Sequence, residues 1–88
     1  MMFVILSYDV GAKRVARTRK TVKKYLSPVL ESVFEGELTP ASLEHLKTEL
    51  AELIDPAQDS IVIYRLGSQQ YVTRSSIGIA SAFSPDFL

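Results

Sequence analysis

A chain of 88 residues with 47% apolar side chains, 23% charged side chains and a formal net charge of zero is long enough for one compact domain, and its composition excludes a disordered chain. The absence of cysteine excludes a disulfide framework, a thiolate metal site and a cysteine nucleophile. No stretch reaches the ~20 apolar residues of a membrane span, and the first apolar run is too short for a signal segment, so we expect a soluble, cytoplasmic protein with no membrane partner.

The N-terminal segment is predicted to be a central strand over residues 2–9. Phe3–Leu6 is continuously apolar and β-prone, and Gly11 follows as a chain-reversal residue. An amphipathic helix is predicted next, over residues 13–26, because apolar side chains recur there at near-helical spacing and another face carries cations. Ser27–Pro28 is expected to end this helix.

The charges are distributed unevenly along the chain. Seven of the ten basic residues lie between Lys13 and Lys24, and no acidic residue occurs between Asp9 and Glu31. Acidic residues dominate from Glu31 to Asp59. Because charges of one sign gathered on one segment create a local field even in a neutral protein, we expect the folded molecule to have a positive side and a negative side.

The second half of the chain alternates strand-like and helix-like patterns. Residues 29–38 are predicted to be extended, as two short strands or one kinked strand. A helix is expected to begin at Thr39–Pro40 and to end at Pro56, since threonine can cap free backbone N–H groups and proline tolerates the first helical position. Its apolar stripe consists of Leu43, Leu46, Leu50 and Leu53. The β-branched run 60–66 predicts another buried strand, and a last strand is expected over 71–79.

The order of these elements predicts an α+β fold of the ferredoxin-like type, β-α-β-β-α-β with an additional C-terminal strand, in which two helices cover one face of an antiparallel sheet. Residues 1–79 are expected to form this single domain. Residues 80–88 are expected to form a tail that docks on a dimer partner, because Phe83, Phe87 and Leu88 are too apolar to be left wholly in water.

Asp9 is the candidate metal ligand, because it stands at the carboxyl end of the first strand, beside the start of the basic helix. A carboxylate there could bind Mg²⁺, which proteins commonly hold by one or two carboxylates together with phosphate oxygens. In a two-fold dimer, two copies of Asp9 could hold a metal ion that polarises a phosphodiester or activates water. From the residues alone, the favoured alternative is that Asp9 caps the first helix.

The basic segment predicts binding to nucleic-acid phosphates, since each lysine or arginine placed on a phosphate releases condensed counterions. The alternative is a solvated helix face, although seven cations without an interspersed acid would then repel one another. The candidate nucleic-acid-binding residues are Lys13, Arg14, Arg17, Lys20 and Lys24. Tyr8, Phe34 and Tyr64 could stack on bases, but aromatic residues in strands more often fill a core.

Four segments, in order, resemble the CRISPR-associated protein 2 family, the small partner of the CRISPR integrase in spacer acquisition. They are Phe3–Val10, Ser32–Thr39, Asp59–Tyr64 and Ile77–Ile79. The strand that ends in Tyr-Asp is a weak signal by itself, whereas the Ser-Val-Phe-Glu-Gly of the second segment is fairly specific. The two at this spacing, in so short a chain, form a strong match that spans nearly the whole sequence.

The resemblance implies a homodimer in which the last strand of one subunit extends the sheet of the other, at the centre of an integrase complex along which double-stranded DNA lies. It also implies that Asp9 is the Mg²⁺-linked acid of an endonuclease acting on single-stranded RNA or double-stranded DNA, with Tyr8 and Phe34 as further catalytic residues and Arg14 as a neighbour. That activity is not uniform in the family, where the subunit acts in integration as a scaffold and a ruler.

One segment departs from the family pattern. Family members often have a glycine, a basic residue and a glutamine just before Ser-Val-Phe, whereas this chain has Ser27–Glu31 there. We therefore favour a DNA-binding scaffold over a Mg²⁺-dependent nuclease. The alternatives are a related endoribonuclease toxin and a ferredoxin-like dimer that binds a small regulatory molecule.

Overall fold

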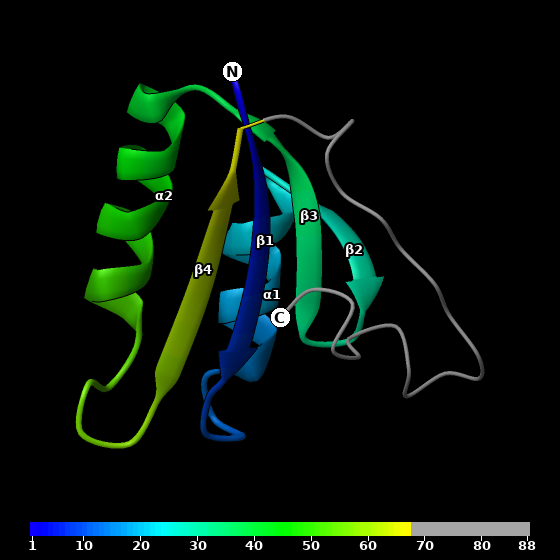
Figure 1. Ribbon diagram of the computed structural model, residues 1–88. Coiled ribbons are helices and arrows are strands. Elements are labelled where there is room, and N and C mark those ends of the chain that lie inside the picture. Colours follow the sequence, from blue (N-terminus) through cyan, green and yellow to red (C-terminus); the bar gives the residue numbers. More distant parts are fainter. Residues whose placement is uncertain (68–88) are drawn as a thin grey trace.

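The computed structural model describes residues 1–67, and it confirms the predicted α+β fold (Figure 1). Its elements are β1 (Met2–Asp9), α1 (Val15–Lys23), β2 (Ser27–Leu30), β3 (Val33–Leu38), α2 (Pro40–Leu53) and β4 (Ser60–Leu66). The strands form one antiparallel sheet in the order β2-β3-β1-β4, which is the ferredoxin-like arrangement. The strand predicted over 71–79 and the tail predicted over 80–88 lie outside the described residues.

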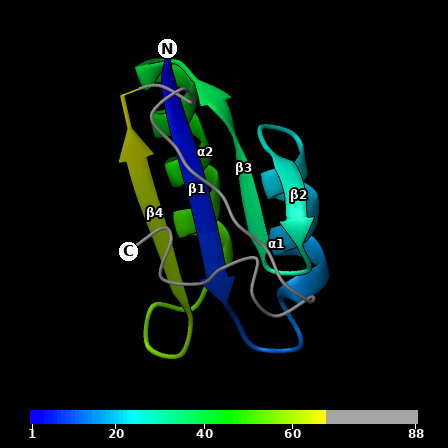
Figure 2. The ribbon, with the colours of Figure 1, turned by 45° about the vertical axis from the view of Figure 1, so that its right-hand side comes forward.

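The two helices lie side by side on one face of the sheet (Figure 2). Strand β1 is central, as predicted, because Phe3–Leu6 is buried at all four positions and can be covered on both faces. Val4 and Leu6 pack in the cluster beneath the helices, whereas Phe3 and Ile5 pack in a second cluster on the opposite face. The sheet is therefore apolar on both sides.

Helix α2 begins and packs as the sequence predicts. The Thr39 hydroxyl accepts a hydrogen bond from the backbone N–H of Ser42 at 3.1 Å, and Pro40 occupies the first helical turn. Leu43, Leu46 and Leu50 are buried beneath the helix. These leucines fix α2 to the sheet because each removes a large apolar side chain from water.

Helix α1 is shorter at both ends than the predicted segment 13–26. Its buried face consists of Thr18, Thr21 and Val22, so two of its three buried side chains are threonines. The Thr18 hydroxyl donates to the backbone carbonyl of Arg14 at 2.8 Å, which satisfies the polar group inside the helix. After Lys23 the chain tightens into turns and enters β2.

The extended segment before α2 forms two short strands, which settles the alternative between two strands and one kinked strand. Glu31 and Ser32 form the turn between β2 and β3. Pro28 lies in β2, at the edge of the sheet, beside a shift in the pairing register. Proline is tolerated at that position because an edge strand does not need every backbone N–H in the ladder.

No helix within residues 1–67 is long and apolar enough to cross a membrane.

Candidate functional site at the end of the first strand and on the basic helix

Asp9 is the last residue of β1 and lies opposite Ser60 of β4. Its side chain is exposed at a recess of about 240 Å³, which we call the Asp9 recess. The recess is lined by Tyr8, Asp9, Val10, Val15, Glu31 and Ser32. Within residues 1–67 the Asp9 carboxylate makes no hydrogen bond or ion pair, so it is free to bind a ligand.

The alternative in which Asp9 caps the first helix is wrong. The N-cap position of α1 is Arg14, and no side chain accepts a hydrogen bond from the backbone there. The first turn of α1 also contains no acidic residue. The acid that binds near the start of this helix is instead Asp59, which accepts a hydrogen bond from the backbone N–H of Gly11 at 2.9 Å.

The described residues provide only part of a metal site. Within residues 1–67, no three histidine, aspartate or glutamate side chains gather in a group that could hold a metal ion. A single free carboxylate does fit Mg²⁺ held jointly with phosphate oxygens, because this ion retains water and often takes one or two protein ligands. Asp9 therefore fits a shared site and not a closed protein cage.

Tyr8 and Phe34, the two other predicted catalytic residues, are buried in the core behind Asp9. Their rings stack at a centroid distance of 6.0 Å, and the Tyr8 hydroxyl donates to the backbone carbonyl of Glu31 at 3.1 Å. The Arg19 guanidinium covers the Phe34 ring, 5.2 Å from its centre. The expectation that these aromatic residues fill the core is confirmed. They support the wall of the Asp9 recess, and a catalytic role for either stays a prediction.

Arg14 is bound to Asp59 by two hydrogen bonds. Its Nε lies 2.5 Å from Oδ2 and its Nη2 lies 2.9 Å from Oδ1 of the carboxylate. The backbone N–H groups of Gly11 and Asp55 donate to the same carboxylate, each at 2.9 Å. Four donors thus converge on a side chain with no exposed surface. The Asp59 carboxylate joins the end of β1, the start of α1 and the loop before β4.

These contacts change the proton affinity of both partners. The Arg14 guanidinium, opposed by burial and assisted by the two backbone N–H groups, holds the pKa of Asp59 well below its ordinary value. The same hydrogen bond raises the pKa of Arg14. Arg14 was predicted to bind phosphate, but its guanidinium is hydrogen-bonded to the Asp59 carboxylate of its own chain. Sequence reasoning missed Asp59 as the partner, because 45 positions separate the two residues.

The remaining predicted phosphate-binding cations lie on or just before α1. Lys13, Arg17 and Lys20 are exposed and form no ion pair within residues 1–67, and Lys23 shares these properties. Lys24 differs, because its Nζ lies 2.5 Å from a carboxylate oxygen of Glu49 on α2. The expected positive side is thus carried by the exposed cations of α1, whereas Arg14 and Lys24 are paired with acids from the second half of the chain.

The family model for CRISPR associated protein Cas2 matches residues 2–74. The chain belongs to the Cas2 family. It is 45% identical over 78 residues to the CRISPR-associated endoribonuclease Cas2 of Thermotoga maritima, an alignment that covers 89% of this chain and 90% of the relative. It is 43% identical over 79 residues to the CRISPR-associated endoribonuclease Cas2 2 of Archaeoglobus fulgidus, with coverage of 90% and 86%.

Solved Cas2 structures share the fold. A crystal structure of Cas2 superposes with a TM-score of 0.82 at 37% identity, over 96% of this chain and 92% of the other. The Cas2 of Streptococcus pyogenes at pH 6.5 superposes with a TM-score of 0.79 at 34% identity, over 88% of this chain and the whole of the other. The predicted family is therefore confirmed. The segment that departs from the family pattern, Ser27–Glu31, forms β2 and ends at Glu31, in the wall of the Asp9 recess.

Proposed function

We propose that the protein is a homodimeric subunit of the CRISPR spacer-acquisition machinery, which binds double-stranded DNA and the CRISPR integrase. The observation that carries the proposal is the set of exposed α1 cations without an ion-pair partner within residues 1–67. Membership of the Cas2 family supports it. Such cations bind DNA through its phosphates, so binding is expected to be independent of sequence and sensitive to salt.

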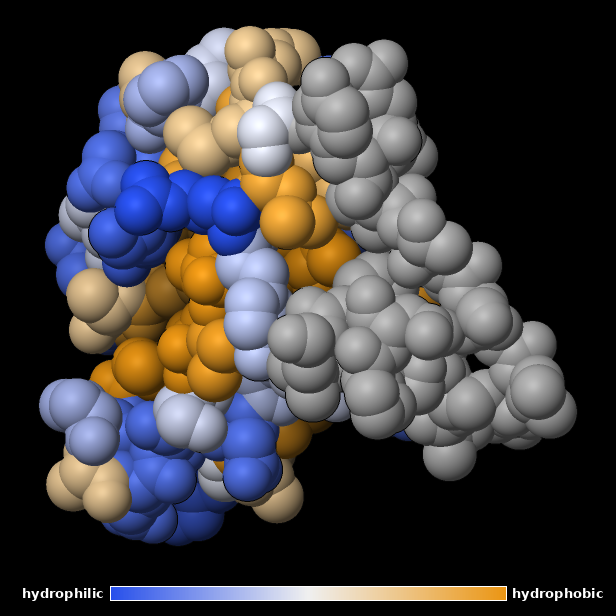
Figure 3. Space-filling model, in the orientation of Figure 1, coloured by the Kyte–Doolittle hydropathy of each residue, from blue (hydrophilic) through white to orange (hydrophobic). Residues whose placement is uncertain are grey.

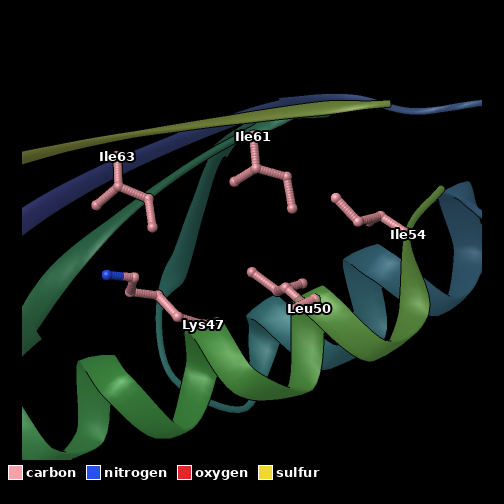
Figure 4. Close-up of a pocket in the computed structure, with 6 residues that line it drawn as sticks. Lys47, Leu50, Ile54, Ile61 and Ile63 are labelled. Carbon is pink, nitrogen blue, oxygen red and sulfur yellow. The ribbon is translucent and has the colours of Figure 1, made fainter. Parts of the chain in front are cut away.

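An apolar groove supports a dimer. The groove has a volume of about 200 Å³ and lies between α2 and β4, the edge strand of the described sheet. Its apolar lining is visible on the surface in Figure 3, and Figure 4 shows Ile61 of β4 pointing toward Leu50 and Ile54, whereas Ile63 points toward Lys47. A partner strand added beside β4 would cover the groove and satisfy the backbone groups of the edge.

A second candidate function, Mg²⁺-dependent cleavage of single-stranded RNA or double-stranded DNA, is favoured by the free Asp9 carboxylate. The relatives named above carry the name endoribonuclease, and Asp9 has no structural partner within residues 1–67. When bound, Mg²⁺ would neutralise phosphate charge and polarise the scissile bond. Asp9 would hold the ion, and the stacked Tyr8 and Phe34 would keep the strand end in place. Glu31 adds a second negative charge at the same recess and opposes the approach of phosphate, so we rank the scaffold first.

A salt titration of duplex binding tests the first proposal. The double variant Arg17→Ala with Lys20→Ala should bind a 30-base-pair duplex more weakly and with a shallower dependence on salt, by about 0.9 in log–log slope for each lost contact. Lys47→Ala on α2 is the control, because it also removes an exposed cation, one whose Nζ lies 3.4 Å from a carboxylate oxygen of Glu44. Lys47 also lines the apolar groove, so light scattering of this variant must give the same mass as wild type. Equal affinity and slope in wild type and the double variant would exclude α1 as the DNA-binding surface.

The dimer and the partner need separate measurements. Light scattering should give twice the chain mass of 9.8 kDa, and co-purification with the CRISPR integrase of the same organism should give a stable complex. A strictly monomeric protein in solution would contradict the homodimer.

A further inference from the structure

Three cations on or directly after α1 line one recess between the two helices. The recess has a volume of about 390 Å³, and we call it the interhelical recess. It is lined by Arg17, Lys20, Thr21, Lys24 and Leu53. Arg17 and Lys20 lie three positions apart on α1, and Lys24 is the C-cap residue directly after the helix. Lys23 does not line this recess and instead lies on a neighbouring one with Arg19.

The chemistry of this lining suits a phosphate group. Arg17 offers a planar fork of donors, Lys20 offers a point charge, and no acidic side chain is part of the lining. No aromatic side chain lines the recess either, so it has no surface on which a base could stack. Lys13 and Lys23 do not line this recess, and each lies at another one.

Glu49 restrains the third cation. One of its carboxylate oxygens accepts a hydrogen bond from Lys24 at 2.5 Å, and the other accepts from the Tyr25 hydroxyl. Glu49 thus anchors to α2 a lysine that would otherwise be available to a ligand. Because both charged side chains are partly exposed to solvent, the pair adds little to stability and can be altered without unfolding the helices.

We propose that the interhelical recess seats one backbone phosphate of the bound duplex through Arg17 and Lys20, and that Glu49 limits the affinity by pairing with Lys24 in the lining of the recess. The proposal rests on the DNA-binding function proposed above and names the site at which that binding concentrates. It makes Glu49 a negative regulator of affinity built into the surface of the protein. Removing its charge should therefore strengthen binding.

The experiment measures the affinity of the full-length protein for a 30-base-pair duplex by fluorescence anisotropy at several salt concentrations. Arg17→Ala and Lys20→Ala should each weaken binding about threefold to tenfold and reduce the salt slope by about 0.9. Lys23→Ala removes a cation of the same helix that does not line the recess, so it should weaken binding less than either of these two variants. Glu49→Gln keeps an acceptor for Tyr25 but frees Lys24, so binding should become about threefold to tenfold tighter with a slope steeper by about 0.9.

A double variant isolates the role of Lys24. Lys24→Ala alone should change affinity little, whereas Lys24→Ala in the Glu49→Gln background should return the affinity to that of wild type. Thermal melts by circular dichroism establish that each variant is folded. An unchanged affinity in Glu49→Gln, or a loss in Lys23→Ala as large as that in Lys20→Ala, would overturn the recess while DNA binding by α1 stands. Wild-type affinity in every α1 variant would overturn the proposed function itself.

Discussion

The Arg14 guanidinium and the Asp59 carboxylate meet in a two-point contact, with Nε 2.5 Å from Oδ2 and Nη2 2.9 Å from Oδ1. The pair connects the start of α1 with the start of β4, and the same carboxylate accepts the backbone N–H of Gly11. Asp9, two residues before Gly11, therefore lies at a strand end that this ion pair fixes in place. The contact makes Arg14 a structural residue of the candidate site.

Removing Arg14 should destabilise the protein far more than removing a neighbouring cation. Arg14→Ala leaves the Asp59 carboxylate buried without its charged partner, and such a group is costly. Arg17→Ala is the matched control, because Arg17 is exposed and makes no ion pair within residues 1–67. In urea denaturation at equal protein concentration, the midpoint should fall clearly in Arg14→Ala and hardly at all in Arg17→Ala. Similar midpoints in the two variants would show that the ion pair is not structural.

The same contact predicts how stability depends on pH. The folded state lowers the pKa of Asp59, so at acidic pH the unfolded chain binds more protons at this residue than the folded chain does. Its contribution is complete above the ordinary carboxyl pKa of about 3.9 and is lost as the pH falls below that value toward the lowered one. Asp59→Asn should therefore be less stable than wild type at pH 7, and the difference should shrink between about pH 4 and pH 2. A constant difference across that range would contradict the assignment.

Gly11 should resist substitution because Arg14 lies over it. A Cβ atom at this position would be 2.6 Å from Nη2 of Arg14, which is too close, and the guanidinium cannot withdraw without breaking its bonds to Asp59. Gly11→Ala should lower the urea midpoint. In the Arg14→Ala background the same substitution should cost much less, since the clash is gone. Additive effects in this double-mutant cycle would mean that the two residues act independently.

The sequence predicted those elements whose signals are local. The apolar run Phe3–Leu6 identified the central strand, and Thr39–Pro40 with its leucine stripe identified α2. The ends of α1 were less well predicted, because Thr18 and Thr21 supply most of its buried face and threonines do not stand out as apolar. The choice between one and two strands before α2 also depended on the turn at Glu31, which the pattern alone left open.

Only the part of the candidate site that is set by neighbouring residues in the sequence could be predicted. Asp9 follows directly from the end of an apolar strand. The state of each cation does not, because it is set by acids brought from far along the sequence: Asp59 reaches Arg14, and Glu49 reaches Lys24. The sequence predicted that the acidic half of the chain would form a side of the molecule separate from the basic segment. Two of its acids instead form ion pairs with cations of that segment.

Leu46 should be among the most sensitive positions of the core. Its side chain is completely buried between α2 and the sheet, so Leu46→Ala removes apolar contacts and leaves a cavity, at a cost of about 2–5 kcal/mol in the free energy of unfolding. Glu52→Ala, at an exposed position of the same helix, should change that free energy by no more than about 0.5 kcal/mol. Chemical denaturation of both variants checks the prediction. A loss below about 1 kcal/mol in Leu46→Ala would show that the cavity collapses.

Asp9→Asn separates catalysis from folding. The Asp9 carboxylate has no hydrogen-bond or ion-pair partner within residues 1–67, so its replacement should change the free energy of unfolding by no more than about 0.5 kcal/mol. If the protein cleaves RNA or DNA with Mg²⁺, the variant should lose that activity, because the ion loses its protein ligand. Glu37→Gln is the matched control. Glu37 is an exposed acid of β3, and in the strand register it lies opposite Phe3, at the other end of β1 from Asp9. Cleavage that persists in Asp9→Asn, or in wild type with EDTA, would assign the activity to another site or to a contaminant and leave the scaffold function as the sole candidate.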